Sequence, residues 1–331
     1  MKTITLSSGA SFPAKEGLSI LDSAKLANVS LPYSCRTGRC STCKCQVLTG
    51  TTSAIREETG LTEEEIKAGW VLSCVRAAES DVLLELDDLG GVQLPVAKTL
   101  PCRISELSLL APDVLSIKLR LPPTANFQFI PGQYIDIIGP NGVRRSYSLA
   151  NSRFEEKMLL LHVRRVDAGV MSHYWFEEAK VNDLLRLNGP LGTFFLRDVV
   201  STDLIFLATG TGIAPVKSML ESIALLPPEK QPKSVTVVWG GRLLHDLYMD
   251  FTSLPGNHKY VPVLSRAGSE WEGARGHVQQ ALLSLHADLS NAAVYACGSD
   301  AMIHGAKNAL QQAGLPANRF YSDAFVCSAS I

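Results

Sequence analysis

Four cysteines in the first quarter of the chain have the spacing of a redox site. Cys35, Cys40 and Cys43 are separated by four and by two residues, and Cys74 follows in a later segment. Two bridged irons need four terminal thiolates, of which a short loop can supply three while a distant segment supplies the fourth. Gly38, inside the loop, allows the sharp bend that turns backbone N–H groups toward sulfur. The spacing therefore predicts a [2Fe–2S] cluster held by these four cysteines.

A zinc site or a disulfide framework would also use cysteines, but both fit this pattern less well. Structural zinc sites commonly have two cysteine pairs of two-residue spacing, and only one such pair is present. The chain begins without the apolar stretch of a signal peptide, and no run is long enough to span a membrane. We therefore expect a cytoplasmic protein with reduced thiols and no membrane partner. Cys45, two residues after Cys43, is expected to be a buried small side chain rather than a ligand.

The bulk composition limits the size and the partners of the protein. Its 331 residues suggest about two or three domains. The chain is 46% hydrophobic and 19% charged, which is enough to build complete cores, and its formal net charge is −1. A nucleic-acid partner is not expected, because the chain has no basic excess.

The elements around the cysteines indicate a small domain over residues 1–92. We expect a helix over 20–27 with Ser19 as its N-cap, and a second helix that begins at Thr62 with Glu65 three residues later. Strands are expected at 2–6, after a turn at 11–13, at 45–48 and at 82–86, and residues 70–74 bring in the last cysteine ligand. This segment resembles the plant-type ferredoxin fold, and all four ligand positions match.

A connector and a set of short strands follow. Residues 93–101 carry two prolines and no periodicity, which indicates a linker. Short strands separated by Pro and Gly turns then predict a small antiparallel barrel over 102–198. The expected strands are 102–107, 114–121, 134–138, 145–149 and 158–166.

Arg145, Tyr147 and Ser148 lie in one of these strands and resemble the flavin-binding signature of the ferredoxin–NADP reductase family. The resemblance implies that Arg145 pairs with a flavin phosphate, that Tyr147 lies against the isoalloxazine, and that Ser148 hydrogen-bonds near its reactive edge. The residue types suit these roles, because arginine binds phosphate through two N–H groups and tyrosine offers an apolar ring. FAD is the expected flavin, with FMN left open.

A second flavin element of the same family follows along the chain. It comprises a strand and a glycine turn before an expected helix at 174–180, where N–H groups could bind the pyrophosphate. The implied contacts are His162, Arg164, Gly169, Met171 and Ser172. Residues 188–192 resemble the turn that closes the barrel in this family.

The last segment, 199–331, predicts a doubly wound α/β domain that binds NAD(P)H. An apolar strand at 204–208 runs into a glycine turn and a helix at 216–225, the arrangement of dinucleotide-binding sites. The turn residues Gly210, Thr211, Gly212 and Pro215 match the element of the same reductase family rather than the general fingerprint. Further strands are expected at 235–239, 260–265 and 293–296, with a helix at 277–285.

The resemblance also implies contacts outside the glycine turn. Cys297 and Gly298 would lie beside the nicotinamide, with simple packing as the alternative role of Cys297. Phe325 would cover the isoalloxazine, with six residues following it. Arg242 and the pair Ser265–Arg266 are further candidates. Arg266 could bind a 2′-phosphate and favour NADPH, or reach the adenine or solvent, and the overall resemblance favours NADH.

Taken over its whole length, the chain resembles the ferredoxin-type flavoprotein reductases. The resemblance implies that NADH gives a hydride to the flavin, that the flavin passes single electrons to the cluster, and that the cluster reduces a partner protein. Ser148, Thr211 and Cys297 would surround the hydride transfer, and no general acid or base is assigned. The expected partner is the sugar dehydrase served by CDP-6-deoxy-Δ3,4-glucoseen reductases. Alternatives are an oxygenase component of aromatic-ring dioxygenases or monooxygenases, and a redox sensor or carrier without turnover.

Overall fold

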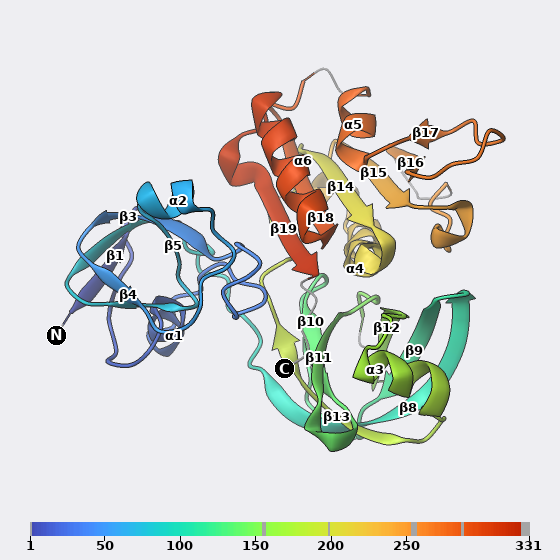
Figure 1. The fold of residues 1–331 in the computed structure, drawn as a ribbon, viewed down its shortest axis with the longest axis horizontal. Coiled ribbons are helices and arrows are strands. Elements are labelled where there is room, and N and C mark those ends of the chain that lie inside the picture. The colour runs from blue at the N-terminus through green and yellow to red at the C-terminus, as the bar shows by residue number, and fades with distance from the viewer. Residues whose placement is uncertain (1, 154–156, 198, 253–256, 286–287, 326–331) are drawn as a thin grey trace. The chain divides into compact units, whose positions relative to one another are not determined.

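A computed structural model describes residues 2–153, 157–197, 199–252, 257–285 and 288–325. The chain separates between Leu94 and Pro95 into two compact units (Figure 1). The first unit has one hydrophobic core and the second has two. The first unit contains the cysteine loop. The second contains both the predicted barrel and the predicted nucleotide-binding domain.

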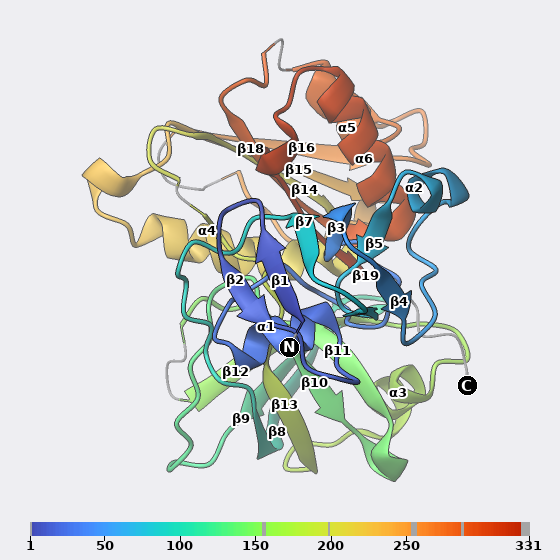
Figure 2. The same ribbon diagram turned by 90° about the vertical axis from the view of Figure 1, so that its left-hand side faces the viewer.

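The first unit is built on a five-stranded mixed sheet with the order β2-β1-β7-β3-β5, seen face-on in Figure 2. Its core is formed by buried aliphatic side chains together with Cys43, Cys45 and Cys74. A separate two-stranded sheet pairs β4 with β6. The strands are β1 (Thr3–Leu6), β2 (Ser11–Pro13), β3 (Lys44–Thr49), β4 (Thr52–Ala54), β5 (Trp70–Leu72), β6 (Arg76–Ala78) and β7 (Val82–Glu85).

The two helices of this unit begin where the sequence predicts. The N-cap of α1 (Ile20–Leu26) is Ser19, whose Oγ accepts a hydrogen bond from the Asp22 backbone N–H. Helix α2 (Glu63–Lys67) starts at a complete capping box of Thr62 and Glu65. Residues 11–13 differ from the prediction, because they form β2 itself, hydrogen-bonded to β1, rather than a turn before a strand.

The barrel of the second unit is an antiparallel sheet with the order β11-β10-β13-β8-β9-β12. A bridge between Leu149 and Leu161 brings the two edge strands together. The inward side chains form one apolar core that includes Trp175 and Met171. The strands are β8 (Lys98–Ala111), β9 (Val114–Arg120), β10 (Tyr134–Ile138), β11 (Arg144–Ser148), β12 (Met158–Arg164) and β13 (Leu184–Leu191), with a 3-10 turn at Pro140–Gly142.

Three predicted features of the barrel are corrected by the structure. Residues 98–101, expected in the linker, belong to β8 and pair with β13. Pro101 is tolerated there because β8 has only one neighbouring strand at that point, so its missing N–H need not face the ladder. Residues 188–191, expected in a turn, are the end of β13, where a bulge against β10 accommodates Gly189 and Pro190. The helix expected from 174 begins earlier, as α3 (Val170–His173), and continues as a π-helix over Tyr174–Glu178.

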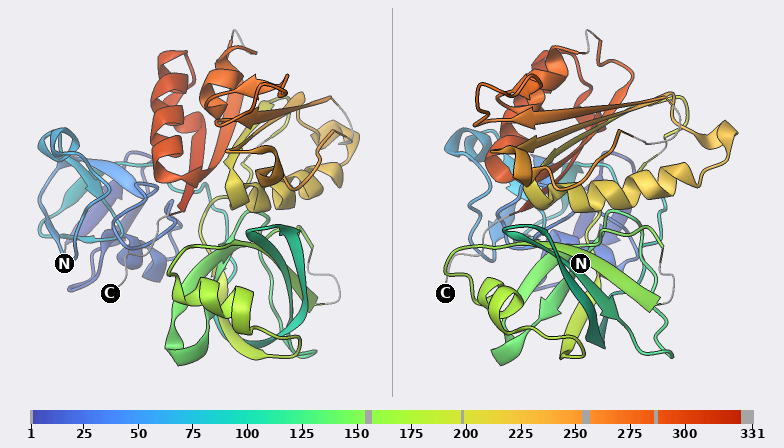
Figure 3. Two further views of the ribbon diagram at one scale, coloured as in Figure 1. Left: turned by 45° about the vertical axis from the view of Figure 1, so that its right-hand side comes forward. Right: turned by 90° about the vertical axis from the view of Figure 1, so that its right-hand side faces the viewer.

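The nucleotide-binding domain is a parallel sheet with the order β17-β16-β15-β14-β18-β19. Helix α4 covers the face of the sheet nearest the barrel, and α5 and α6 cover the opposite face (Figure 3). The elements are β14 (Asp203–Thr209), α4 (Ile213–Ala224), β15 (Ser234–Gly241), β16 (His258–Leu264), β17 (Ala274–Arg275), α5 (Val278–Leu283), β18 (Ala292–Ser299), α6 (Asp300–Gln312) and β19 (Phe320–Phe325), with 3-10 turns at Gly210–Gly212, Pro228–Lys230, Leu244–Asp246 and Ala317–Arg319.

The order of the parallel strands places a switch point in the middle of this sheet. Successive crossovers lead from β14 to β15 on one side and later return to β18 on the other. Ligands of such sheets bind outside the carboxyl ends of the strands where the order reverses. Thr209 and Ser299, at the ends of β14 and β18, therefore mark the expected binding crevice. None of the described helices is long and apolar enough to span a bilayer.

Candidate functional site: a thiolate loop, a barrel face and a nucleotide turn

The four predicted ligands of the cluster form two pairs of thiols. Cys35 hydrogen-bonds with Cys40, and Cys43 hydrogen-bonds with Cys74. The Cys40 hydrogen bond lowers the pKa of Cys35 to about 4, while the same bond raises the pKa of Cys40. Likewise the Cys43–Cys74 bond lowers the pKa of Cys74 and raises that of Cys43. Cys40, Cys43 and Cys74 are buried, and Cys35 is half-buried.

This arrangement fits a two-iron cluster better than a single ion. Within the described ranges, no group of three or more His, Cys, Asp or Glu side chains is arranged for one metal ion. A [2Fe–2S] cluster instead needs two thiolates at each of two irons, and two thiol pairs supply them. Cys45 is fully buried in the core, and burial raises its pKa to about 12, as expected for a packing residue.

The backbone of the loop directs N–H groups at sulfur. The N–H of Thr37 lies 3.4 Å from Cys35 Sγ, and the N–H of Cys35 lies 3.4 Å from Cys40 Sγ. The N–H of Gly38 points at Cys74 and helps to lower the pKa of that thiol. Gly38 has a φ of 78°, and a Cβ there would lie 2.3 Å from the Glu57 carbonyl oxygen, so only glycine fits.

The predicted flavin signature lies on β11, at an edge of the barrel sheet. Arg145 and Tyr147 point to one face of the strand, and Ser148 is buried at its end. Tyr147 accepts a 2.9 Å hydrogen bond from Trp175 Nε1, and burial raises the pKa of its phenol to about 12. Among the described residues the Arg145 guanidinium hydrogen-bonds only to the Arg144 carbonyl, which leaves donors for an anion.

His162 lies on β12, where the barrel meets the nucleotide-binding domain. Its Nδ1 is 3.2 Å from the hydroxyl of Tyr248, and the two rings meet edge to face. Burial, together with the nearby Lys217, lowers the pKa of His162 to about 4. The imidazole is therefore neutral at physiological pH and cannot serve as a cation for a phosphate.

Arg164 and Arg242, both predicted to bind cofactor, are paired with carboxylates. Arg164 forms ion pairs with Asp113 and Asp246. Arg242 approaches the same two carboxylates, at 3.5 Å and 3.3 Å. These guanidinium groups are therefore already neutralised by the protein, which the sequence did not indicate.

At the turn of the second flavin element, the Met171 side chain faces away from solvent. Gly169 is the N-cap of α3, and the Ser172 Oγ accepts a 2.8 Å hydrogen bond from the Val166 N–H. The Met171 side chain is buried in the barrel core against Gly139, where a Cβ would lie 2.3 Å from its sulfur. Met171 can therefore contact a ligand at this turn through its backbone but not through its side chain.

The nucleotide turn brings two chain segments into direct contact at the switch point. A Cβ on Gly212 would lie 2.2 Å from the carbonyl oxygen of Cys297, and one on Gly298 would lie 2.1 Å from Thr209 Oγ1. Glycine at both positions lets the turn after β14 pack against the end of β18. Gly210 has a φ of 54°, and its carbonyl accepts a 3.0 Å hydrogen bond from Trp239 Nε1. This close packing leaves the N–H groups of the turn at the rim of the crevice.

The other predicted nucleotide contacts lie at this end of the sheet but differ in exposure. The Cys297 thiol is fully buried in the core, and burial raises its pKa well above the ordinary value. Pro215 is buried in the first turn of α4, where a missing N–H breaks no helical hydrogen bond, and Thr211 is half-buried. Ser265 and Arg266 follow β16 and are exposed, and Phe325, at the end of β19, is 38% exposed. The six residues after Phe325 lie outside the described ranges.

Sequence reasoning missed four residues that shape this site: Trp175, Tyr248, Asp113 and Asp246. Each acts through a partner far along the chain, as Asp246 does with Arg164, 82 positions away. No local pattern marked Trp175 as a site residue, and nothing local to Asp113 distinguishes it from an ordinary turn aspartate.

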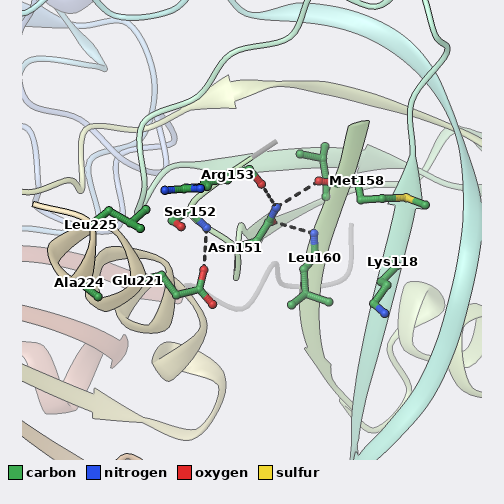
Figure 4. Close-up of a pocket in the computed structure, with 10 residues that line it drawn as sticks. Lys118, Asn151, Ser152, Arg153, Met158, Leu160, Glu221, Ala224 and Leu225 are labelled. Atoms are coloured by element: carbon green, nitrogen blue, oxygen red, sulfur yellow. Dashed lines mark hydrogen bonds between the residues drawn. The ribbon is translucent and has the colours of Figure 1, made fainter. Parts of the chain in front are cut away.

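A cavity of about 510 Å³ lies elsewhere in the second unit, between the barrel and the last turns of α4 (Figure 4). Its polar wall contains the Asn151 side chain, which hydrogen-bonds to Leu160 N–H, and Glu221, which accepts from the Ser152 N–H at 3.0 Å. None of the sequence-predicted site residues is among those that line it. The cavity therefore belongs to the packing of α4 on the barrel rather than to the predicted sites.

Three family models match successive parts of the chain. The "2Fe-2S iron-sulfur cluster binding domain" matches residues 4–79, the "Oxidoreductase FAD-binding domain" matches 101–196, and the "Oxidoreductase NAD-binding domain" matches 206–308. Each model falls on the part of the structure that holds the corresponding predicted residues. The chain therefore binds a [2Fe–2S] cluster, FAD and NAD.

Known proteins also match this chain over nearly its whole length. The CDP-6-deoxy-L-threo-D-glycero-4-hexulose-3-dehydrase reductase of Yersinia pestis is 42% identical over 97% of each chain. Reductase component 1 of terephthalate 1,2-dioxygenase from Comamonas sp is 32% identical, covering 96% of this chain and 95% of its own. Among solved structures, the Amycolatopsis cytochrome P450 reductase GcoB matches with a TM-score of 0.75 at 28% identity, over 98% of this chain and 99% of its own.

These similarities extend over all three domains, and they agree with the geometry of the thiol pairs and of the switch-point turn. A bound flavin supplies the step between a two-electron donor and a one-electron acceptor, and the chain supplies the surfaces that hold donor and acceptor. The chain belongs to the family of iron–sulfur flavoprotein reductases, oxidoreductases that pass electrons from NADH through FAD to a [2Fe–2S] cluster.

Proposed function

We propose that this chain is the reductase component of a nucleotide-sugar dehydrase, delivering electrons one at a time to a dehydrase that acts on a CDP-6-deoxyhexose. The observation that carries the proposal is the difference in sequence identity between relatives that cover this chain almost equally. Two Yersinia dehydrase reductases are 42% identical to this chain, whereas the terephthalate dioxygenase reductases are 32% identical. An oxygenase component is the alternative partner. A cytoplasmic location and a preference for NADH over NADPH are part of the proposal.

We assign the site residues to the cofactors along this electron path, beginning with the cluster and the flavin. We assign the cluster to Cys35, Cys40, Cys43 and Cys74, with one iron for each thiol pair. Arg145, whose guanidinium hydrogen-bonds only to the Arg144 carbonyl in the part of the chain that the structure describes, would bind a flavin phosphate, and the Tyr147 ring would lie against the flavin.

The remaining roles concern the hydride. Ser148, at the buried end of β11, would bond near the reactive edge of the flavin. Thr211 and the backbone at Cys297 would flank the nicotinamide, since the buried Cys297 thiol packs in the core. His162 and Met171 would shape the flavin site without charge, and the turn at Gly169 would offer N–H groups to the pyrophosphate.

The proposal is tested by reconstitution with purified partners. The holoenzyme is mixed anaerobically with NADH and either a CDP-sugar dehydrase with its substrate or the oxygenase component of terephthalate dioxygenase with terephthalate. We expect NADH oxidation and reduced sugar product with the dehydrase, and little turnover with the oxygenase. Faster turnover with the oxygenase would select the alternative partner. Bound cofactors with no NADH oxidation by any acceptor, including ferricyanide, would instead identify a sensor or carrier.

A further inference from the structure

Four charged side chains form a closed ring where the barrel meets the nucleotide-binding domain. The barrel contributes Asp113 and Arg164, and the nucleotide-binding domain contributes Arg242 and Asp246. We call these four residues the charge ring. Arg164 Nε lies 3.1 Å from Asp113, and Arg164 Nη2 contacts Asp246. Arg242 lies 3.3 Å from Asp246 and 3.5 Å from Asp113, so opposite charges alternate around the ring.

Asp246 is the most buried member of the charge ring. Its side chain is 1% exposed. One carboxylate oxygen accepts hydrogen bonds from the backbone N–H groups of Arg242, at 2.8 Å, and Leu243, at 3.1 Å. Although burial alone would raise its pKa, the hydrogen bonds from Arg242 and from the backbone, with the charge of Arg164, lower the pKa of Asp246 to about 2. The other oxygen contacts Arg164 across the domain boundary.

Arg164, which pairs with Asp246, also lies against the nucleotide turn. A Cβ on Gly210 would lie 2.9 Å from Arg164 Nη1, so the guanidinium lies directly against the first residue of that turn. Two residues earlier on β12, and therefore on the same face of the strand, His162 contacts Tyr248 of the nucleotide-binding domain. Strand β12 of the barrel thus contacts the nucleotide-binding domain at two points, and one of them is the predicted dinucleotide-binding turn.

We propose that Asp246 is a positioning residue for hydride transfer: by holding Arg164 against Gly210, it fixes the nucleotide turn relative to the flavin-bearing barrel. Hydride transfer needs the donor carbon of the nicotinamide and the acceptor nitrogen of the flavin within about 3–3.5 Å of each other, and a misplacement of about 1 Å can cost about a hundredfold in rate. Asp246 itself does not touch the reacting atoms. It acts through Arg164, and the carboxylate charge and the fork geometry of the guanidinium are both required.

The first test measures flavin reduction in the Asp246→Asn holoenzyme. In anaerobic stopped-flow, we expect the limiting rate of flavin reduction by NADH to fall by about tenfold or more, with FAD content unchanged. The apparent Kd for NADH should change by less than about threefold, because the turn itself remains. Asp246→Glu, which keeps the charge, should recover part of the rate. The matched control is Asp203→Asn, which removes a carboxylate of the same domain that pairs with Lys233 and Ser234 at the far end of β14.

The second test asks whether Asp246 acts through Arg164. In an Arg164→Gln background, Asp246→Asn should cause no further loss of rate, and hydrogen exchange over residues 207–213 should rise equally in both single variants. A limiting rate for Asp246→Asn equal to that of Asp203→Asn would overturn the proposal, as would additive losses in the double variant. If Asp246→Asn does not fold, Arg164→Lys provides the same test, because it keeps the charge but loses the fork. An unchanged rate in that variant would equally overturn the proposal.

Discussion

Replacing Cys74 by serine should remove the cluster and leave hydride chemistry intact. Cys74 supplies half of one thiol pair, and a protonated serine hydroxyl is a poor substitute for a thiolate at iron. All four cluster thiols lie before Leu94, whereas every predicted flavin and nucleotide residue lies after Pro95, in a unit with its own cores. Separate sites with no shared contacts usually couple by about 0.3–0.5 kcal/mol, which is about a factor of two in rate.

The assay compares cluster content with reduction of ferricyanide, a small acceptor that can take electrons from the flavin. For Cys74→Ser we expect loss of cluster iron and of electron delivery to a protein partner, with NADH–ferricyanide activity within about twofold of the parent. Cys45→Ser is the matched control, because Cys45 is equally buried but belongs to no thiol pair. It should keep its iron at a cost of about 1–3 kcal/mol in stability. A folded Cys74→Ser protein that has lost ferricyanide activity would refute this order of transfer.

Two further predictions concern the second unit. Because burial lowers the pKa of His162 to about 4 from 6.5, the native state binds fewer protons than the unfolded state between these values. The contribution of His162 to the free energy of unfolding is therefore complete above about pH 6.5. It is lost as the pH falls, and the loss is about 2 kcal/mol at about pH 5. Urea unfolding of His162→Gln should show a flatter pH dependence there, and an unchanged slope would contradict the assignment. Gly212→Ala, whose Cβ would lie 2.2 Å from the Cys297 carbonyl oxygen, should abolish flavin reduction by NADH but keep FAD and cluster. Gly305→Ala, which meets only Gln279 at 3.3 Å, should be neutral in the same assay.

Local patterns predicted the parts of the fold that local physics determines. The cysteine spacing predicted the cluster loop because three of the four ligands lie in one short segment. The prediction that N–H groups of this loop face sulfur is confirmed by Thr37 and Cys35. The capping box at Thr62 is likewise a contact within three residues. Five of the six barrel strands could be found, because Pro and Gly turns separate several of them. The [2Fe–2S], FAD and NAD predictions are confirmed by the three family models.

Other features depended on contacts that no local pattern contains. Arg164 and Arg242 have the residue type of phosphate ligands, and the sequence alone gave no reason to pair them with carboxylates. Asp113 lies 129 positions from Arg242, and only the fold brings the two together. Strand β13 was missed for a similar reason, because Gly189 and Pro190 resemble a turn, and only the pairing with β10 shows that β13 continues through them with a bulge. The individual flavin and nucleotide contacts therefore stay predictions.

The division of the chain into units follows from the two kinds of transfer that it performs. Hydride transfer needs bond-scale contact between nicotinamide and flavin. The two domains that bind them are accordingly joined by direct side-chain contacts. Lys217 donates to the Ala150 carbonyl at 2.9 Å, Ser218 donates to the Asn151 carbonyl at 2.8 Å, and Arg164 pairs with Asp246. Passing a single electron to the cluster does not need bond-scale contact between the two cofactors. The cluster can therefore belong to a unit with a separate core. Substitutions at the charge ring should therefore slow flavin reduction without changing the cluster, whereas substitutions in the cysteine loop should do the reverse.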